Sequence, residues 1–141
     1  MILHLPPPVH GAAMMGQYIK ESALMHQYFD ADYVNLSTSH SLAGVEKINA
    51  GKFTNLLQIQ WNIFKQLLRT NYKVCYVTMT TYGPGFYKDQ LVVLVLRLFR
   101  KKIIYHFHNK GISRHTSWMG KLLCRFAYDG TSAILLSELL R

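Results

Sequence analysis

Hydrophobic positions along the chain alternate between two periods. Short runs rich in β-branched and aromatic residues, typical of buried strands, are separated by longer stretches whose apolar positions recur every three or four residues, as in helices. Strands are expected at Ile2–Leu5, Tyr33–Leu36, Lys73–Met79, Lys102–His108 and Ser132–Ser137. Helices are expected at Ala12–Tyr28, Phe53–Thr70, Phe86–Phe99 and Ser117–Tyr128, with a loop at Ser37–Lys52 and a last helix beginning at Ser137.

This alternation predicts an α/β fold, in which about five parallel strands form a doubly wound sheet with helices on both faces. The strands are apolar throughout instead of alternating, which favours cover on both faces. We expect the flavodoxin-like strand order 2-1-3-4-5. A chain of 141 residues is long enough for one domain with a substantial core.

Unusual residues follow three of the expected strands. They are the segments Pro6–Gly11 after the first strand, Thr80–Gly85 after the third and His108–His115 after the fourth. In doubly wound sheets, ligands bind outside the carboxyl ends of the strands, near the point where the strand order reverses. The sequence therefore predicts a binding site at this edge of the sheet.

The charge of the chain is strongly positive and unevenly spread. The formal net charge is +9, and Arg97–Arg125 contains eight Lys or Arg and no Asp or Glu. Such a stretch favours an anionic partner, with a solvated basic face as the alternative. Only the positive charge supports nucleic acid as this partner, and no specific nucleic-acid partner is expected. For an anionic membrane surface, we expect the apolar residues of Leu91–Lys102 to pack on the sheet and only the basic end, Arg97–Lys102, to face lipid.

Other patterns restrict the class of protein. The N-terminus lacks a basic region before its apolar residues, and the longest apolar run, Leu91–Leu96, is too short to span a bilayer. Cys75 and Cys124 lie far apart and are expected to be reduced thiols. We expect a cytoplasmic protein, with peripheral binding to the inner face of the membrane as a further option. No metal is expected, because no carboxylate or thiolate accompanies His106 and His108.

Four segments, in order along the chain, resemble a known family. "HLPPPVHGAAMMGQYI", "NLSTSHSL…GKF", "IIYHFHNKG" and "AILLSELL" are similar to the N-terminal half of family-4-like retaining glycosyltransferases with the GT-B fold. The resemblance implies an acceptor-side, Rossmann-like domain. The whole enzyme would transfer a sugar from a nucleotide-sugar to a glycan or lipid-linked acceptor in polysaccharide or glycolipid synthesis.

The resemblance also implies a second, C-terminal domain that binds most of the donor. Nothing in residues 1–141 is similar to that domain, so we expect a truncated, single-domain chain that is inactive by itself. The donor would be a substrate, and no cofactor is expected.

The first loop contributes three candidate binding residues, His10, Gly11 and Ala12. A glycine between the first strand and the first helix lets backbone N–H groups approach a phosphate at the helix N-terminus, and the prolines before it are expected to hold the loop extended. In the resembled family this loop faces the donor phosphates. The alternative is a tight turn in which a small residue is needed for packing.

The fourth strand and the residues after it contribute four more candidates. The resemblance implies that His108 is an active-site histidine that contacts the transferred sugar or the acceptor. Its role would be hydrogen bonding and charge stabilisation. Asn109, Lys110 and Arg114 follow, and the two basic side chains could complement a diphosphate or an anionic acceptor, with surface solvation as the alternative.

The alternative hypothesis is a function of a different class, without catalysis. The chain could be a non-catalytic, flavodoxin-like binding or regulatory module that uses a basic edge to hold an anionic partner.

Overall fold

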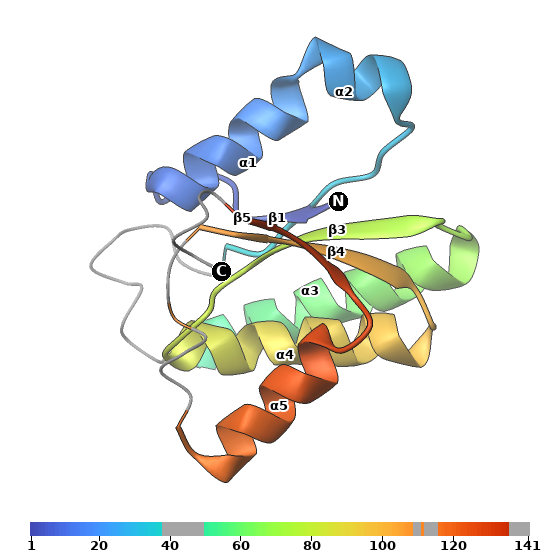
Figure 1. Ribbon diagram of the computed structural model, residues 1–141. Helices are drawn as coiled ribbons and strands as arrows, with labels where there is room; N and C mark the ends of the chain where they lie inside the picture. The colour runs from blue at the N-terminus through green and yellow to red at the C-terminus, as the bar shows by residue number, and fades with distance from the viewer. Residues whose placement is uncertain (38–49, 109–110, 112–115, 136–141) are drawn as a thin grey trace.

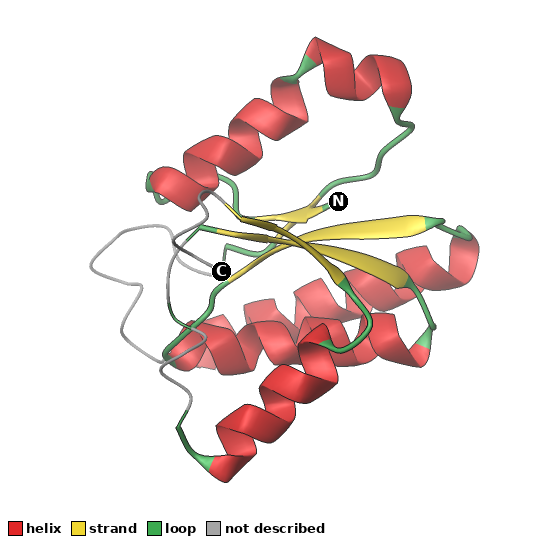
Figure 2. Ribbon diagram, in the orientation of Figure 1, coloured by secondary structure: helices red, strands yellow, loops and turns green. Residues whose placement is uncertain are grey.

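The fold is a five-stranded parallel sheet between two layers of helices (Figures 1 and 2). The computed structural model describes residues 1–37, 50–108, 111 and 116–135. The strands are β1 (Ile2–Leu3), β2 (Val34–Asn35), β3 (Val74–Met79), β4 (Lys102–Phe107) and β5 (Ser132–Leu135). The helices are α1 (Gly11–Glu21), α2 (Ala23–Tyr28), α3 (Ala50–Arg69), α4 (Pro84–Leu98) and α5 (Trp118–Tyr128).

The strand order is β2-β1-β3-β4-β5, and every pair is parallel, so the predicted doubly wound order is confirmed. Helices α1 and α2 lie on one side of the sheet and α3, α4 and α5 on the other (Figure 1). Because β2 and β3 lie on opposite sides of β1, the loops after β1 and β3 flank the point where the strand order reverses.

The expected first helix is two helices. Ser22 lies between α1 and α2 with φ −66° and ψ 116°, which is an extended conformation. Its hydroxyl accepts a hydrogen bond from the amide of Met25 at 3.3 Å and so caps α2. The apolar pattern continues through Ser22, which is why the sequence predicted one helix.

The start of α4 also differs from its expected position. Pro84 is the first helical residue, two positions earlier than predicted, and Gly83 caps the helix with φ 76°. Proline suits the first turn because the amide it lacks has no partner there, and a positive φ favours glycine. Part of the expected turn Thr81–Gly85 is therefore helix.

The core lies between the sheet and helices α3, α4 and α5. Alternate residues of β3 and β4 point into it, among them Val77, Tyr105 and Phe107. They meet Ile63 of α3 and Leu96 of α4. This layer holds the carboxyl ends of the strands in place.

Two expectations about which apolar residues are buried against the sheet or under its helices are wrong. All four residues of β5 are exposed, because β5 is an edge strand and the described helices leave it uncovered. In α4, only part of the apolar run packs on the sheet: Val92, Val93 and Leu96 are buried, whereas Leu91 and Leu94 are exposed. The helix is apolar on both of its sides.

Candidate functional site

The loop after β1 begins the predicted site at the carboxyl edge of the sheet. The expected extended approach is wrong here, because residues 6–8 form a bend in which the Pro6–Pro7 and Pro7–Pro8 peptide bonds are cis. The loop then reaches His10, whose backbone is extended with φ −154° and ψ 165°.

His10 is the N-cap of α1. Its Nδ1 accepts a hydrogen bond from the amide of Ala13 at 3.3 Å. The amides of Gly11 and Ala12 lie at the first two helical positions, where a helix offers no carbonyl acceptor. Gly11 is exposed and Ala12 half-buried. This helix end can therefore donate to an anion.

Gly11 is not required by packing. An added Cβ there would meet nothing within 4 Å, so the tight-turn alternative has no steric support. Gly16 is the glycine that the fold needs, since a Cβ at that position would lie 2.1 Å from the carbonyl oxygen of His4. The close contact presses α1 onto the end of β1.

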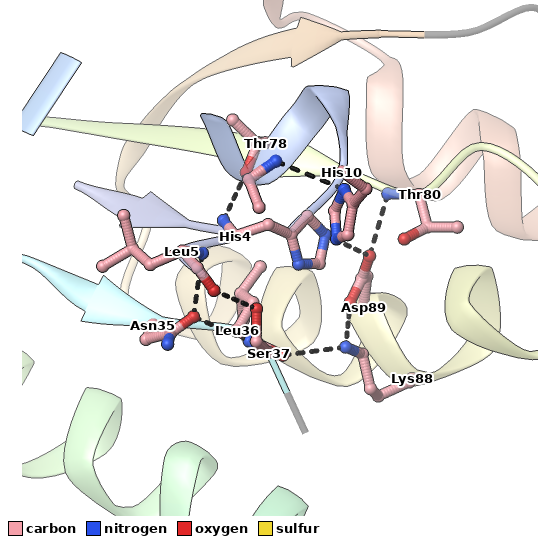
Figure 3. A network of polar contacts seen from close by, with 11 residues as sticks. His4, Leu5, His10, Asn35, Leu36, Ser37, Thr78, Thr80, Lys88 and Asp89 are labelled. Carbon is pink, nitrogen blue, oxygen red and sulfur yellow. Dashed lines mark hydrogen bonds and ion pairs between the residues drawn. The ribbon is translucent and has the colours of Figure 1, made fainter. Parts of the chain in front are cut away.

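A buried polar network lies beside the α1 N-terminus (Figure 3). Asp89 of α4 is fully buried, and its Oδ2 accepts a hydrogen bond from the amide of Thr80 at 2.9 Å. The Nε2 of His4 lies 3.9 Å from the same oxygen, and Lys88 Nζ lies 3.4 Å from Oδ1. One carboxyl group thus joins the ends of β1 and β3 to α4.

Side chains also fix the end of β1 to its neighbours. The hydroxyl of Thr78 accepts from the amide of His4 at 3.0 Å, and the side-chain oxygen of Asn35 accepts from the amide of Leu5 at 3.0 Å. Ser37 donates to the carbonyl of Leu5 at 2.8 Å. Lys88 Nζ donates to the carbonyl of Leu36 at 2.9 Å. These bonds position the loop that leads to His10 (Figure 3).

His108 lies at the end of β4 and faces the same region. Its ring centroid is 4.2 Å from that of His106, and the Nδ1 of His106 is hydrogen-bonded to the hydroxyl of Tyr76. His108 Nε2 is buried and has no hydrogen-bond partner in the described part of the chain. A buried ring nitrogen without a partner is uncommon in folded proteins, and this marks His108 as a candidate for a functional role.

Burial favours the neutral form of His4 and of His108. It lowers the pKa of His4 to about 4, against the opposing effect of Asp89. Burial also lowers the pKa of His108 to about 4, assisted by the positive charge that His106 and His10 would carry. At neutral pH each ring therefore offers one donor and one acceptor nitrogen. His10 and His108 are close enough for their charges to influence each other, so both lie at the carboxyl edge of the sheet.

The structure thus brings together four of the residues predicted from the sequence: His10, Gly11, Ala12 and His108. The other three, Asn109, Lys110 and Arg114, lie outside the described residues.

Sequence reasoning missed the network around Asp89. Asp89 lies three residues after Phe86 and four before Val93, both buried, so the helical period places it on the face toward the sheet. A charged residue on a buried stripe was the available signal. His4 lay within the expected first strand and carried no signal of its own, because its partner is 85 positions away.

Within the described residues, no group of three or more His, Cys, Asp or Glu side chains has an arrangement suited to a metal ion. None of the described helices combines the length and the apolar character needed to cross a bilayer.

Comparisons with models of protein families, with curated proteins and with solved structures found no match to this chain.

Proposed function

We propose that this chain is the acceptor-side domain of a retaining glycosyltransferase that uses a nucleotide-sugar donor. The observation that carries the proposal is the pairing of an open helix N-terminus at Gly11 with a neutral, partly unpaired His108 across the reversal of strand order. The first can bind a diphosphate, and the second can hydrogen-bond a sugar or acceptor hydroxyl.

In this proposal each residue of the site has a separate role. The amides of Gly11 and Ala12 bind diphosphate oxygens, and His10 fixes their direction by capping the helix. His108 contacts the transferred sugar or the acceptor and stabilises charge during transfer. His4 and Asp89 are positioning residues that hold the first loop against β3 and α4. A second domain would supply most of the donor contacts and close the site.

A titration with inorganic pyrophosphate, the group common to nucleoside-diphosphate donors, tests the binding step. We expect saturable NMR shifts of the Gly11 and Ala12 amides, lost in Gly11→Val and retained in Gly11→Ala. Both variants should fold, because a Cβ at Gly11 meets no atom. Shifts spread over the basic residues instead, with none at Gly11, would contradict the proposal.

The non-catalytic binding module remains the second candidate. Arg100 and Lys102 are exposed at the opposite, amino edge of the sheet and could hold an anionic partner there. The two functions differ in location: anion binding that is removed by Arg100→Gln with Lys102→Gln, but not by Gly11→Val, would favour the binding module.

A further inference from the structure

Helix α4 carries an apolar stripe that faces away from the sheet. Tyr87, Leu91, Leu94 and Leu98 are exposed, and their spacing of four, three and four residues places them on one side of the helix. Leu98 is 72% exposed. A soluble helix normally has polar residues at these positions, so this side of α4 is suited to a nonaqueous contact.

Helix α3 repeats the pattern on one side of α4. Leu57, Trp61 and Leu68 are exposed and follow the same helical period. Trp61 stacks on Phe64 with ring centroids 5.7 Å apart, and Lys65 Nζ lies 5.8 Å from the Trp61 ring. The stripe therefore combines aromatic surface with a nearby cation.

Helix α5 repeats it on the other side of α4. Trp118, Met119, Leu122 and Phe126 are exposed, and Trp118 is the most open of them at 77%. Helices α3 and α5 both contact α4, and the three lie on one side of the sheet (Figure 2). Their outward stripes thus belong to one surface, the outer face of α3, α4 and α5.

The exposed charged side chains that helices α3 and α5 contribute to this outer face are basic. Helices α3 and α5 contain no Asp or Glu, and the single acid of α4, Asp89, is fully buried. Lys65 and Arg69 lie on α3, and Lys121 and Arg125 lie on α5. The surface therefore has an apolar centre on α4 and basic residues on both flanking helices.

The rim and the opposite side of the molecule differ from this pattern. Asp129, just after α5, lines a hollow of about 330 Å³ together with Arg97 and with Leu122, Arg125 and Phe126 of α5, so an acid borders the outer face there. Arg97 is also held there by hydrogen bonds to the carbonyls of Ala127 and Asp129, at 2.9 and 2.6 Å, so it is occupied within the fold. On the other side of the sheet, α1 carries Glu21 as well as Lys20.

We propose that the outer face of α3, α4 and α5 lies flat on an anionic lipid bilayer. Apolar side chains would enter the headgroup boundary, and the flanking Lys and Arg would contact acidic headgroups. Tryptophan at positions 61 and 118 suits this depth, because its ring is apolar and carries one polar N–H group. A symmetric contact between two copies is disfavoured because it would bring the basic residues of α3 and α5 together, with Asp129 as the acid beside them.

Vesicle flotation tests the inference and does not depend on the proposed transferase function. The chain should float with phosphatidylcholine vesicles containing phosphatidylglycerol, and less with phosphatidylcholine alone or at high salt. Leu91→Gln with Leu94→Gln should weaken binding about tenfold or more, because two side chains are withdrawn from the bilayer. The control is Tyr18→Gln with Leu24→Gln, two apolar residues on α1 and α2 that are more exposed than Leu91 and Leu94.

Charge is tested separately. Lys121→Gln with Arg125→Gln should weaken binding about tenfold. Lys20→Gln with Lys73→Gln, which changes the net charge equally away from this face, should leave it within about twofold. Circular dichroism confirms folding. Absence of vesicle binding, equal losses in target and control variants, or dimers in sedimentation that Leu91→Gln dissociates would each overturn the inference.

Discussion

The side chains of His4 and Asp89, 85 positions apart in the sequence, meet at 3.9 Å beneath the loop that leads to α1. The carboxyl group is fully buried and also accepts the amide of Thr80. This contact determines how the ends of β1 and β3 and the start of α4 fit together, so it supports several predictions.

Replacing Asp89 with alanine should destabilise the fold strongly. The amide of Thr80 would lose its acceptor and Lys88 would lose its ion-pair partner, and we expect a loss of roughly 2–4 kcal/mol in the free energy of unfolding. Asp89→Asn should cost less, because its side-chain oxygen can still accept from Thr80. Urea unfolding of the two variants measures the difference, and equal losses would show that the hydrogen bond contributes little.

Stability should fall as the pH decreases from about 6.5 towards 4. The pKa of His4 is lowered to about 4 in the fold, so below 6.5 the unfolded chain binds protons that the folded chain does not. The pKa of His108 is lowered in the same way and adds to the effect. Thermal or urea unfolding across this range measures it.

His4→Gln is the variant that isolates one contribution to the pH dependence. It should reduce the loss of stability between pH 6.5 and 4 without abolishing it, since His108 remains. A pH dependence identical to that of the parent would mean that His4 is not protonated on unfolding in this range.

Gly16→Ala and Gly11→Ala should have opposite consequences although both glycines lie in α1. At Gly16 the new Cβ would be 2.1 Å from the carbonyl of His4, and we expect a loss of about 1–3 kcal/mol from forced separation. At Gly11 the added Cβ meets nothing, so stability should be unchanged or slightly higher. Unfolding midpoints compare the pair, and a tolerated Gly16→Ala would refute the close packing.

Arg100→Gly should stabilise the end of α4. Arg100 has φ 52°, and its amide and that of Lys101 donate to the carbonyls of Arg97 and Leu96, the pattern of a helix terminated by a left-handed residue. Relief of the left-handed strain exceeds the entropy cost of glycine, so we expect a gain of about 0.5–1 kcal/mol. Arg100→Ala is the control for the lost charge and should give no gain.

In an enzyme that contains this domain, His108→Ala should act mainly on kcat. The expected contact is with the reacting sugar or acceptor, and loss of such a group costs on the order of a hundredfold. Gly11→Val should impair use of the donor, seen as a raised KM, a lowered kcat, or both. The chain alone should transfer no sugar. Unchanged turnover in a folded His108→Ala enzyme would assign this histidine to packing.

The strand order could be predicted because each period of the sequence reports local structure, and few ways exist to connect alternating strands and helices. The break at Ser22 could not, because serine fits either a helix or a cap, and the apolar pattern runs through it.

The candidate site was predicted only in part for a different reason. His10 and His108 stood out because they follow strands, whereas His4 and Asp89 gain their significance from a contact between distant segments. Gly16 likewise differs from Gly11 only in what the fold places beside it. Local sequence patterns cannot predict contacts between residues that are distant in the sequence.

The glycine at position 111 has a consequence for the two loops at the carboxyl edge. A Cβ there would lie 2.1 Å from the hydroxyl oxygen of Thr81, so the backbone after β4 rests directly on the residue that leads into α4. Neither segment can shift toward the other without collision. A displacement of Thr81 toward Gly111 must therefore move Gly111 as well, so the two segments are coupled by steric contact at this point.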